Sequence, residues 1–331
     1  MDEGVEERKR RKDFVVAVQA GNEAAIAEIA LAHPDLLSGH VGRNGETALS
    51  IAAQNGRAGS ARVLLEAGAD PNARNNDGSA PLHRAGESPE TMRLLLAWGA
   101  DPCAKNRQGQ TILFTCDCEE AIEIAVEQLG AERLEEIAEG GRTPLLCALA
   151  DGREEAARAL LARGANLMAE DWNGEGAINA CVRWCGEDML KELLDLGASA
   201  KCRPLSGPCA LAQCILRKNE TIARMILAAG ADPNRPMESG RRVVTVAVAD
   251  NLKDLAEALV RAGASLSFKD REGLGLRRSV ERMSSRTDVA ECDRLVSHLE
   301  RLEETLAIGA AIGEALAERD EPMAQSRRMS I

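Results

Sequence analysis

The sequence predicts an all-α solenoid, a stack of helix-turn-helix units joined by β-hairpin-like loops. The main observation is a Gly-Ala pair that recurs along the chain with spacings of 31, 31, 34, 33, 33 and 33 residues. These pairs are Gly68-Ala69, Gly99-Ala100, Gly130-Ala131, Gly164-Ala165, Gly197-Ala198, Gly230-Ala231 and Gly263-Ala264. Aromatic residues make up only 2% of the 331 residues, so aliphatic side chains and alanine are expected to form the core. A regular apolar pattern near the C-terminus predicts one long helix.

One copy of the unit, at residues 41–74, illustrates how each is expected to be built. Thr47 is a suitable N-cap for a short helix with an apolar face, and Gly56 follows the end of that helix. A second helix ends at Gly68, where glycine adopts a positive φ at little cost. Asp70-Pro71-Asn72 then turns the chain outward. The unit is therefore helix, turn, helix and hairpin loop.

This unit resembles the ankyrin repeat. Ala80-Pro81-Leu82-His83 and Thr143-Pro144-Leu145-Leu146 match its Thr-Pro-Leu-His signature, and Gly-Ala-Asp-Pro-Asn occurs at 68–72 and 230–234. The resemblance covers roughly residues 13–300 and implies about eight repeats. It implies binding to proteins without naming the partner, because this fold carries many unrelated functions.

Four segments are expected along the chain. They are a basic N-terminal extension at 1–12, the repeat solenoid at 13–285, the last repeat with its long C-terminal helix at 286–319, and a disordered polar tail at 320–331. The repeats at 75–105 and 106–139 depart from the pattern, since Gly130-Ala131 leads into 132–135 without the Asp-Pro-Asn turn. We expect either a kink or a hairpin replaced by helix there.

The long helix at 288–319 is predicted from apolar and small residues at alternating three- and four-residue steps. These residues are Cys292, Leu295, Leu299, Leu302, Leu306, Gly309, Gly313 and Leu316. Such a seam is typical of a coiled coil. Two roles remain open: the helix folds back to cap the last repeat, or it mediates self-association by pairing with another chain.

Composition and motifs argue against several other classes of protein. The formal charge of −12 disfavours nucleic acid as a partner. The sequence has no run of 18 apolar residues, which a membrane-spanning helix would need, and no hydrophobic signal segment. We therefore expect neither a membrane protein nor a secretory protein. No phosphate-binding loop or Gly-x-Ser-x-Gly motif is present, so we expect no enzyme activity and no cofactor. The acidic interval 117–139, opposed only by Arg133, is expected to steer a basic partner.

The ten cysteines are interpreted as structural. Cys116, Cys181 and Cys214 occupy the repeat position that Ala52 fills, where a thiol serves as a small apolar group. No Cys-x-x-Cys pair is present, so no metal site is expected. Many free thiols favour a reducing compartment, and the chain is expected to be cytoplasmic.

The three tryptophans are the most specific indication of a binding surface. The resemblance implies that the exposed and variable positions of a repeat lie at the hairpin tip, after the small pair of the first helix, and before Gly-Ala. Trp172, Trp184 and Trp98 occupy these three kinds of position. Tryptophan and arginine are the residues most enriched in binding hot spots.

We therefore expect a protein-protein interaction scaffold or adaptor that binds its partner on the concave face of the stack. The residues expected at the site are Trp172, Asn173, Arg183 and Trp184 at its centre, Arg107, Asn76 and Arg43 along the same groove, and Trp98 as a further partner-binding residue. Trp172 and Trp184 belong to one repeat and are placed to flank one pocket. In the alternative interpretation, Trp184 only covers a weak turn, because Cys185 replaces the usual glycine. The alternative function is a structural subunit docked into a larger assembly through its C-terminal helix.

Two short signals complete the analysis. Lys9, Arg10, Arg11 and Lys12 have the composition of a nuclear-import patch, although a polar N-terminal cap has the same composition. Arg327-Arg328-Met329-Ser330-Ile331 resembles a site for cyclic-AMP-dependent kinases, which makes Ser330 a candidate for phosphorylation.

Overall fold

The all-α fold is confirmed by the computed structural model, which describes residues 3–201, 208–237, 239–283 and 289–328. Within these residues the only β-type pairings are isolated bridges, between Glu170 and Gly176 and between Pro236 and Arg242. The chain divides into two compact units, Met1–Cys185 and Gly186–Ile331. Each unit is described separately below.

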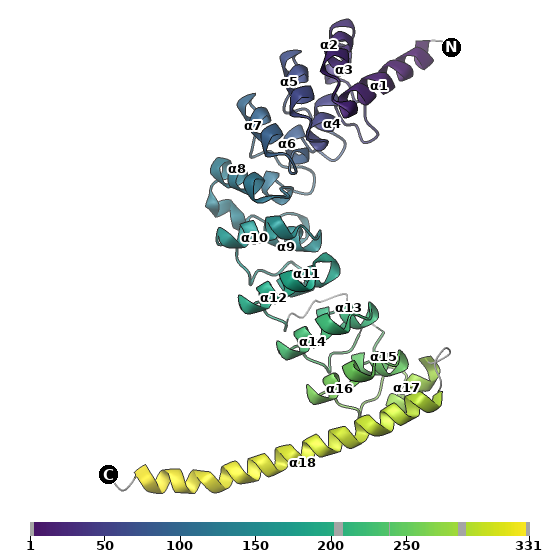
Figure 1. The fold of residues 1–331 in the computed structure, drawn as a ribbon, viewed down its shortest axis with the longest axis vertical. Helices are drawn as coiled ribbons and strands as arrows, with labels where there is room; N and C mark the ends of the chain where they lie inside the picture. Colours follow the sequence, from purple (N-terminus) through teal and green to yellow (C-terminus); the bar gives the residue numbers. More distant parts are fainter. Residues whose placement is uncertain (1–2, 202–207, 238, 284–288, 329–331) are drawn as a thin grey trace. The chain divides into compact units, whose positions relative to one another are not determined.

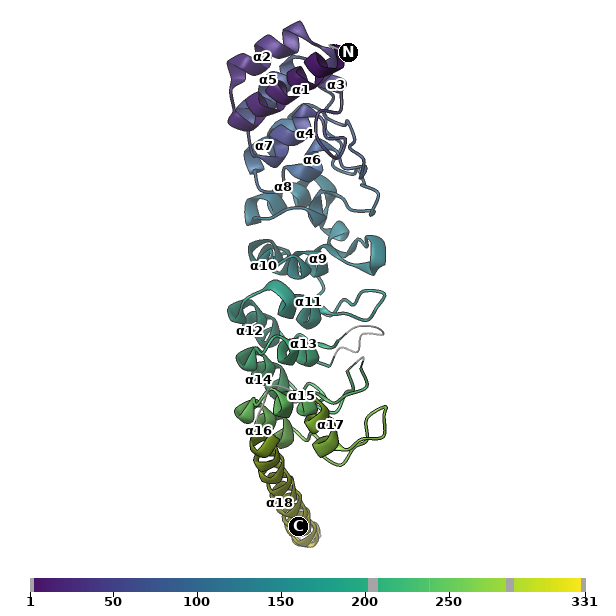
Figure 2. The same ribbon diagram turned by 90° about the vertical axis from the view of Figure 1, so that its right-hand side faces the viewer.

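The first unit is a stack of short helices in two layers (Figure 1). Its elements are α1 (Glu3–Ala20), α2 (Glu23–Ala32), α3 (Asp35–Ser38), α4 (Ala48–Gln54), α5 (Ala58–Glu66), α6 (Pro81–Arg84), α7 (Pro89–Ala97), η1 (Ile112–Phe114), α8 (Glu119–Leu129), η2 (Ala131–Glu135), η3 (Glu139–Gly141), α9 (Pro144–Ala150), α10 (Glu154–Ala162) and α11 (Ala177–Trp184). The inner layer includes α1, α4, α6, η1, α9 and α11, and the outer layer α2, α5, α7, α8 and α10. Figure 2 shows that the loops of this unit project from the side of the inner layer.

Local sequence explains where the inner helices begin. The Thr47 hydroxyl accepts a hydrogen bond from the Ser50 N–H at 3.2 Å, and Thr143 caps α9 in the same way, 3.3 Å from the Leu146 N–H. His83 accepts from the Ala80 N–H through Nδ1 at 3.2 Å and donates through Nε2 to the Gln110 carbonyl at 3.0 Å. Burial lowers the pKa of His83, which favours the neutral ring that this pair of bonds requires. The signature histidine therefore joins two consecutive repeats.

The predicted basic extension at 1–12 is part of a longer helix. α1 runs without a break from Glu3 to Ala20, and its second half buries Phe14 and Val18 completely. Glutamate, lysine and arginine are good helix formers, so the helix nucleated by these buried residues continues through the basic segment. The basic residues are consequently held on a helix that packs against α2 and α4.

In the irregular repeats at 75–139 a helical segment replaces a hairpin, which is the second of the two arrangements expected from the sequence. η2 follows Gly130 directly, at the place where other repeats have a hairpin, and the inner helix is reduced to the three-residue η1. Arg153, at the start of α10, reaches back to this site. Its guanidinium donates to the Cys116 carbonyl at 2.7 Å and to the Phe114 carbonyl at 2.8 Å, and lies 3.6 Å from the Asp117 carboxylate. A side chain of the next repeat thus satisfies carbonyls that the shortened helix leaves open.

The second unit repeats the two-layer arrangement. Its helices are α12 (Glu187–Asp195), α13 (Ala210–Leu216), α14 (Glu220–Ala228), α15 (Val243–Ala249), α16 (Lys253–Arg261), α17 (Leu276–Met283) and α18 (Val289–Arg328). α13, α15 and α17 form the inner layer, and α12, α14, α16 and α18 form the outer layer. The first part of α18 is therefore the outer helix of the last repeat.

α18 covers the last repeat with its first turns and then extends beyond it (Figure 1). Cys292, Leu295 and Leu299 of the predicted seam are buried against α15, α16 and α17, so this part of the helix caps the stack. Farther along, Leu306 is 41% exposed and Ile308 is 62% exposed. The helix continues to Arg328, past the predicted boundary at 319, through residues that mostly have good helix propensity.

Removing the Arg153 guanidinium is expected to destabilise the first unit. Arg153→Met keeps much of the apolar stem but leaves two buried carbonyls without a donor, which costs about 1–3 kcal/mol. Urea denaturation of the full chain measures this loss. Arg93→Met is the matched control, because Arg93 pairs with Glu120 on the surface and such pairs contribute about 0–1 kcal/mol. Equal losses in the two variants would contradict the role assigned to Arg153.

Candidate protein-binding surface

The three tryptophan side chains are all exposed on the first unit. Trp172 is 69% exposed, Trp184 is 66% exposed and Trp98 is 45% exposed. The aliphatic residues of the same helices are buried, as Leu95 of α7 and Ile178 of α11 illustrate. The indoles are therefore not core residues. Large apolar groups left in water at several positions indicate a surface that contacts another molecule.

Trp172 lies at the tip of a hairpin that is closed by the Glu170–Gly176 bridge. Its backbone N–H donates to the Gly140 carbonyl of the preceding loop at 2.9 Å. The indole rests so close to Gly141 that a Cβ on that residue would lie 2.2 Å from the ring Cδ1. Gly141 also has a φ of 77°, which side chains rarely tolerate. Glycine at this position thus permits the ring to lie against the neighbouring loop.

A carboxylate fixes the shape of the hairpin tip. Asp171 accepts hydrogen bonds from the N–H groups of Asn173 and Glu175, each at 2.9 Å. The Arg142 guanidinium lies 3.6 Å from the same carboxylate. The loop that presents Trp172 and Asn173 is therefore held in one conformation before any partner arrives.

Hydrogen bonds between successive loops place several predicted residues in one row. The Asn76 N–H donates to the Asn44 carbonyl at 3.0 Å, and the Arg107 N–H donates to the Asp77 carbonyl at 2.9 Å. The Trp172–Gly140 bond continues the same pattern farther along the unit. Arg43 precedes Asn44 at the start of this row and is exposed. The structure thus brings the predicted hairpin residues together on one edge.

Trp184 and Arg183 are at the other end of the same repeat. Trp184 is the last residue of α11, and Trp172 lies in the hairpin that leads into the first residue of that helix, Ala177. An eight-residue helix is about 12 Å long. The two indoles therefore lie at opposite ends of α11, and the expectation that they flank one small pocket gives way to a surface that spans the helix.

The alternative interpretation of Trp184 as a cover for a weak turn is not supported by its surroundings. Cys185 is the residue buried at that turn, and its thiol donates to the Leu149 carbonyl at 3.3 Å. Trp184 itself is two-thirds exposed. Trp98 is separate from both, because it follows α7 in the outer layer of an earlier repeat.

The acidic interval at 117–139 is less acidic in the fold than in the sequence. Bases from neighbouring repeats pair with its carboxylates: Arg93 with Glu120 at 2.6 Å, Arg163 with Glu123 at 2.7 Å, Arg153 with Asp117 at 3.6 Å, and Lys105 with Glu136. Residues distant in the sequence thus supply the opposing charge. The structure gives no strong reason to expect a basic partner at this site.

The three cysteines predicted to fill the Ala52 position are buried as expected, whereas Cys103 is exposed. Cys116, Cys181 and Cys214 are at most 1% exposed, as is Ala52. Burial raises the pKa of the Cys116 thiol, raises the pKa of Cys147 to about 11 and raises the pKa of Cys214 to about 12. Across the residues the structure describes, no cluster of three or more His, Cys, Asp or Glu side chains has the arrangement of a metal site.

A comparison with protein families identifies the repeats. A family model described as ankyrin repeats (3 copies) matches residues 14–106 and 86–171. The chain is an ankyrin-repeat protein. Ankyrin repeats are in general modules for binding other proteins. In the described ranges of this ankyrin-repeat protein, no helix combines the length and the apolar character needed to cross a bilayer. Ser330, the candidate phosphorylation site, lies outside the described residues.

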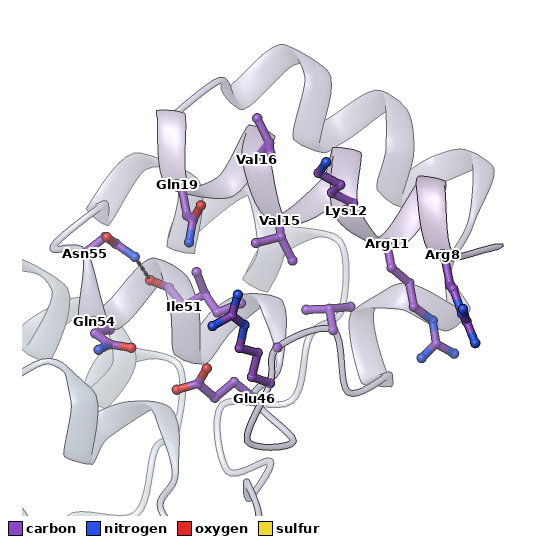
Figure 3. A pocket seen from close by; sticks show the side chains of 13 residues that line it. Arg8, Arg11, Lys12, Val15, Val16, Gln19, Glu46, Ile51, Gln54 and Asn55 are labelled. Atoms are coloured by element: carbon purple, nitrogen blue, oxygen red, sulfur yellow. Dashed lines mark hydrogen bonds between the residues drawn. The ribbon is translucent and has the colours of Figure 1, made fainter. Parts of the chain in front are cut away.

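One feature of this ankyrin-repeat protein was not expected from its sequence. α1, α4 and residues 41–46 border a groove of about 760 Å³ near the N-terminus (Figure 3). The signal was present in the spacing of residues 8, 11, 12, 15 and 19, which lie at positions i, i+3, i+4, i+7 and i+11. A boundary at residue 12 hides this face, because it separates the basic residues from the helix that continues to Ala20.

The buried thiols are expected to make the folded state less stable at high pH. An ordinary thiol has a pKa near 9, so between about pH 9 and pH 12 the unfolded chain loses protons that Cys147 and Cys214 keep when folded. The unfolded state then binds fewer protons, and the free energy of unfolding falls as pH rises, by at most about 1.4 kcal/mol per pH unit for each thiol. Urea denaturation over this pH range measures the slope.

The variants that test this prediction are Cys147→Ala and Cys214→Ala. Each should reduce the slope of the free energy of unfolding against pH. Cys103→Ala is the control, because Cys103 is exposed. A slope that is the same in all variants would show that these thiols do not carry the pH dependence.

Proposed function

We propose that this ankyrin-repeat protein is a non-enzymatic adaptor that binds a protein partner through the face formed by its hairpin tips and inner helices. The observation that carries the proposal is the exposure of two indoles in one repeat, Trp172 at 69% and Trp184 at 66%. Burying an aromatic side chain of this size in an interface contributes more than burying most other residues.

Three features support this surface as the binding site. The hydrogen-bonded row of loops holds Asn76, Arg107 and Trp172 in fixed positions, which lowers the entropy lost on binding. Arg183 stands next to Trp184 and adds a long cationic side chain to the same end of α11. The distance between the indoles fits an elongated partner, such as a helix or an extended segment, better than a small molecule.

Replacing both indoles with alanine should abolish partner binding without affecting folding. In the variant Trp172→Ala/Trp184→Ala the affinity for captured partners is expected to fall by roughly 30-fold or more for each indole lost, because a hot-spot residue contributes about 2 kcal/mol or more. Affinity capture with mass spectrometry, comparing the native chain with the double variant, identifies the proteins that are lost. Thermal melting of both chains shows whether folding is intact.

Leu31→Ala is the matched control for that experiment, since Leu31 is 82% exposed on the outer helix α2. It should leave capture unchanged. If the double variant captures the same proteins as the native chain, the indoles are not the binding site. If it melts at a much lower temperature, their role is structural.

A second candidate function is that of a structural subunit held in an assembly through α18. The observation that favours it is the exposure of Leu306 and Ile308 on the part of the helix beyond the last repeat. The first part of α18 is already used to cap the stack, through Leu295 and Leu299. Only the extension is therefore available to pair with another chain.

This candidate predicts that truncation after Glu304 removes self-association but keeps the fold. Such a chain retains the buried residues of α18, so its melting temperature should stay close to that of the full chain. Sedimentation velocity over a range of concentrations compares the two, with Leu306→Ser/Ile308→Ser in the full chain as a control for loss of helix length. Identical sedimentation of all three chains would exclude self-pairing through the extension.

A further inference from the structure

The groove near the N-terminus begins with one face of α1. Arg8, Arg11, Lys12, Val15 and Gln19 lie at positions i, i+3, i+4, i+7 and i+11, so they form a single stripe along the helix. The stripe is basic at Arg8, Arg11 and Lys12 and continues with Val15 and Gln19. Val16, next to it, also borders the groove and is 53% exposed.

The opposite wall comes from α4 and the loop before it. Ile51, Gln54 and Asn55 again lie on one helical face, and Figure 3 shows them across the groove from the α1 side chains. The Asn55 amide donates to the Ile51 carbonyl at 2.7 Å, which holds this wall in place. Val41 and Arg43 border the groove from the loop. Its volume of about 760 Å³ is within the range of known ligand clefts, about 300–1,000 Å³.

The charges around the groove are mostly positive and only partly neutralised. In the described part of the chain, Arg8, Lys12 and Arg43 make no ion pair with a carboxylate. Arg11 pairs with Glu7 on its own helix. Glu46, the acidic residue of the groove, is 3.5 Å from Arg84, which offsets its charge. The groove therefore combines a cationic rim with the apolar side chains of Val15, Val16 and Val41.

We propose that this groove, which shares Arg43 with the N-terminal end of the proposed binding face, takes an acidic amphipathic helical segment of a partner protein. The carboxylates of that segment would face the cations of α1 and Arg43, and its aliphatic side chains would cover the valines. Charge complementarity of this kind directs association and fixes orientation. The amides of Gln19, Gln54 and Asn55 offer hydrogen bonds to polar groups along such a segment.

The observations favour a peptide over a simple anion. A phosphate or sulfate would satisfy the cations but would leave the exposed Val16 and its apolar neighbours in water. The cations also occupy successive turns of α1, so their charges are spread along the helix axis. An elongated acidic ligand matches this distribution, whereas a compact one does not.

The test uses the full chain and a synthetic probe. The probe is a labelled helical peptide of about five turns, with leucine at three- and four-residue steps and glutamate on the flanking positions. Fluorescence anisotropy measures its binding to the native chain and to Arg8→Gln/Lys12→Gln/Arg43→Gln. The triple variant is expected to bind at least about tenfold more weakly, and Val16→Ser should weaken binding independently of salt.

The charge-matched control is Arg62→Gln/Arg93→Gln/Arg158→Gln, which removes three exposed cations from the outer helices α5, α7 and α10. It should bind the probe as the native chain does, and so should Trp172→Ala/Trp184→Ala, because neither indole borders the groove. A probe with the leucines replaced by alanine should bind at least about tenfold more weakly.

Several results would overturn the proposal. Equal binding by the groove variant and the charge-matched control would mean that only net charge matters. Binding of the alanine probe as strong as that of the leucine probe would mean that the valines take no part. If the native chain binds vesicles of phosphatidylcholine and phosphatidylserine more tightly than the peptide probe, and the groove variant loses this binding, the occupant of the groove is a membrane surface instead. Self-association in sedimentation that is lost in the groove variant would identify a second copy of this chain as the occupant.

Discussion

Each repeat of this protein buries its apolar side chains against its neighbours, because two short helices cannot enclose a core by themselves. Within each compact unit, inner helices contact neighbouring inner helices, outer helices contact neighbouring outer helices, and hydrogen bonds join successive loops. Within each unit this nearest-neighbour contact determines the positions of the other features. It explains why a core almost without aromatic residues is sufficient, since leucine and alanine fill the thin layers between helices.

The same constraint explains how an irregular repeat is tolerated. The repeat at 106–139 has a 3-10 turn in place of its inner helix, so it cannot satisfy all its own backbone groups. Arg153 supplies the missing donors from the following repeat, and the opposing carboxylate Asp117 keeps its charge balanced. A defect in one repeat is thus corrected by a residue of the next repeat, and its effect remains local.

The two proposed binding surfaces follow from residues that stacking does not use. Trp172 and Trp184 occupy positions at either end of an inner helix and remain 69% and 66% exposed. α1 begins the stack, so one face of it packs on α2 and α4 while the basic stripe borders an open groove. The first surface is aromatic and suits an elongated partner. The second is cationic and aliphatic and suits an acidic helix, so one chain could hold two different segments at once.

The amino-acid sequence by itself determined the all-α repeat fold, the helix caps at Thr47 and Thr143, the burial of the repeat cysteines and the exposure of the indoles. These features follow from a period and from local chemistry, which are visible along the chain. Only the tertiary structure decided that Trp172 and Trp184 stand at opposite ends of α11, that bases from neighbouring repeats pair with the acidic interval, and that residues 8–12 belong to a packed helix bordering a groove. The physical reason is that the ion pairs join residues of different repeats, the separation of the indoles depends on the length of α11, and the length of α1 depends on buried residues such as Phe14.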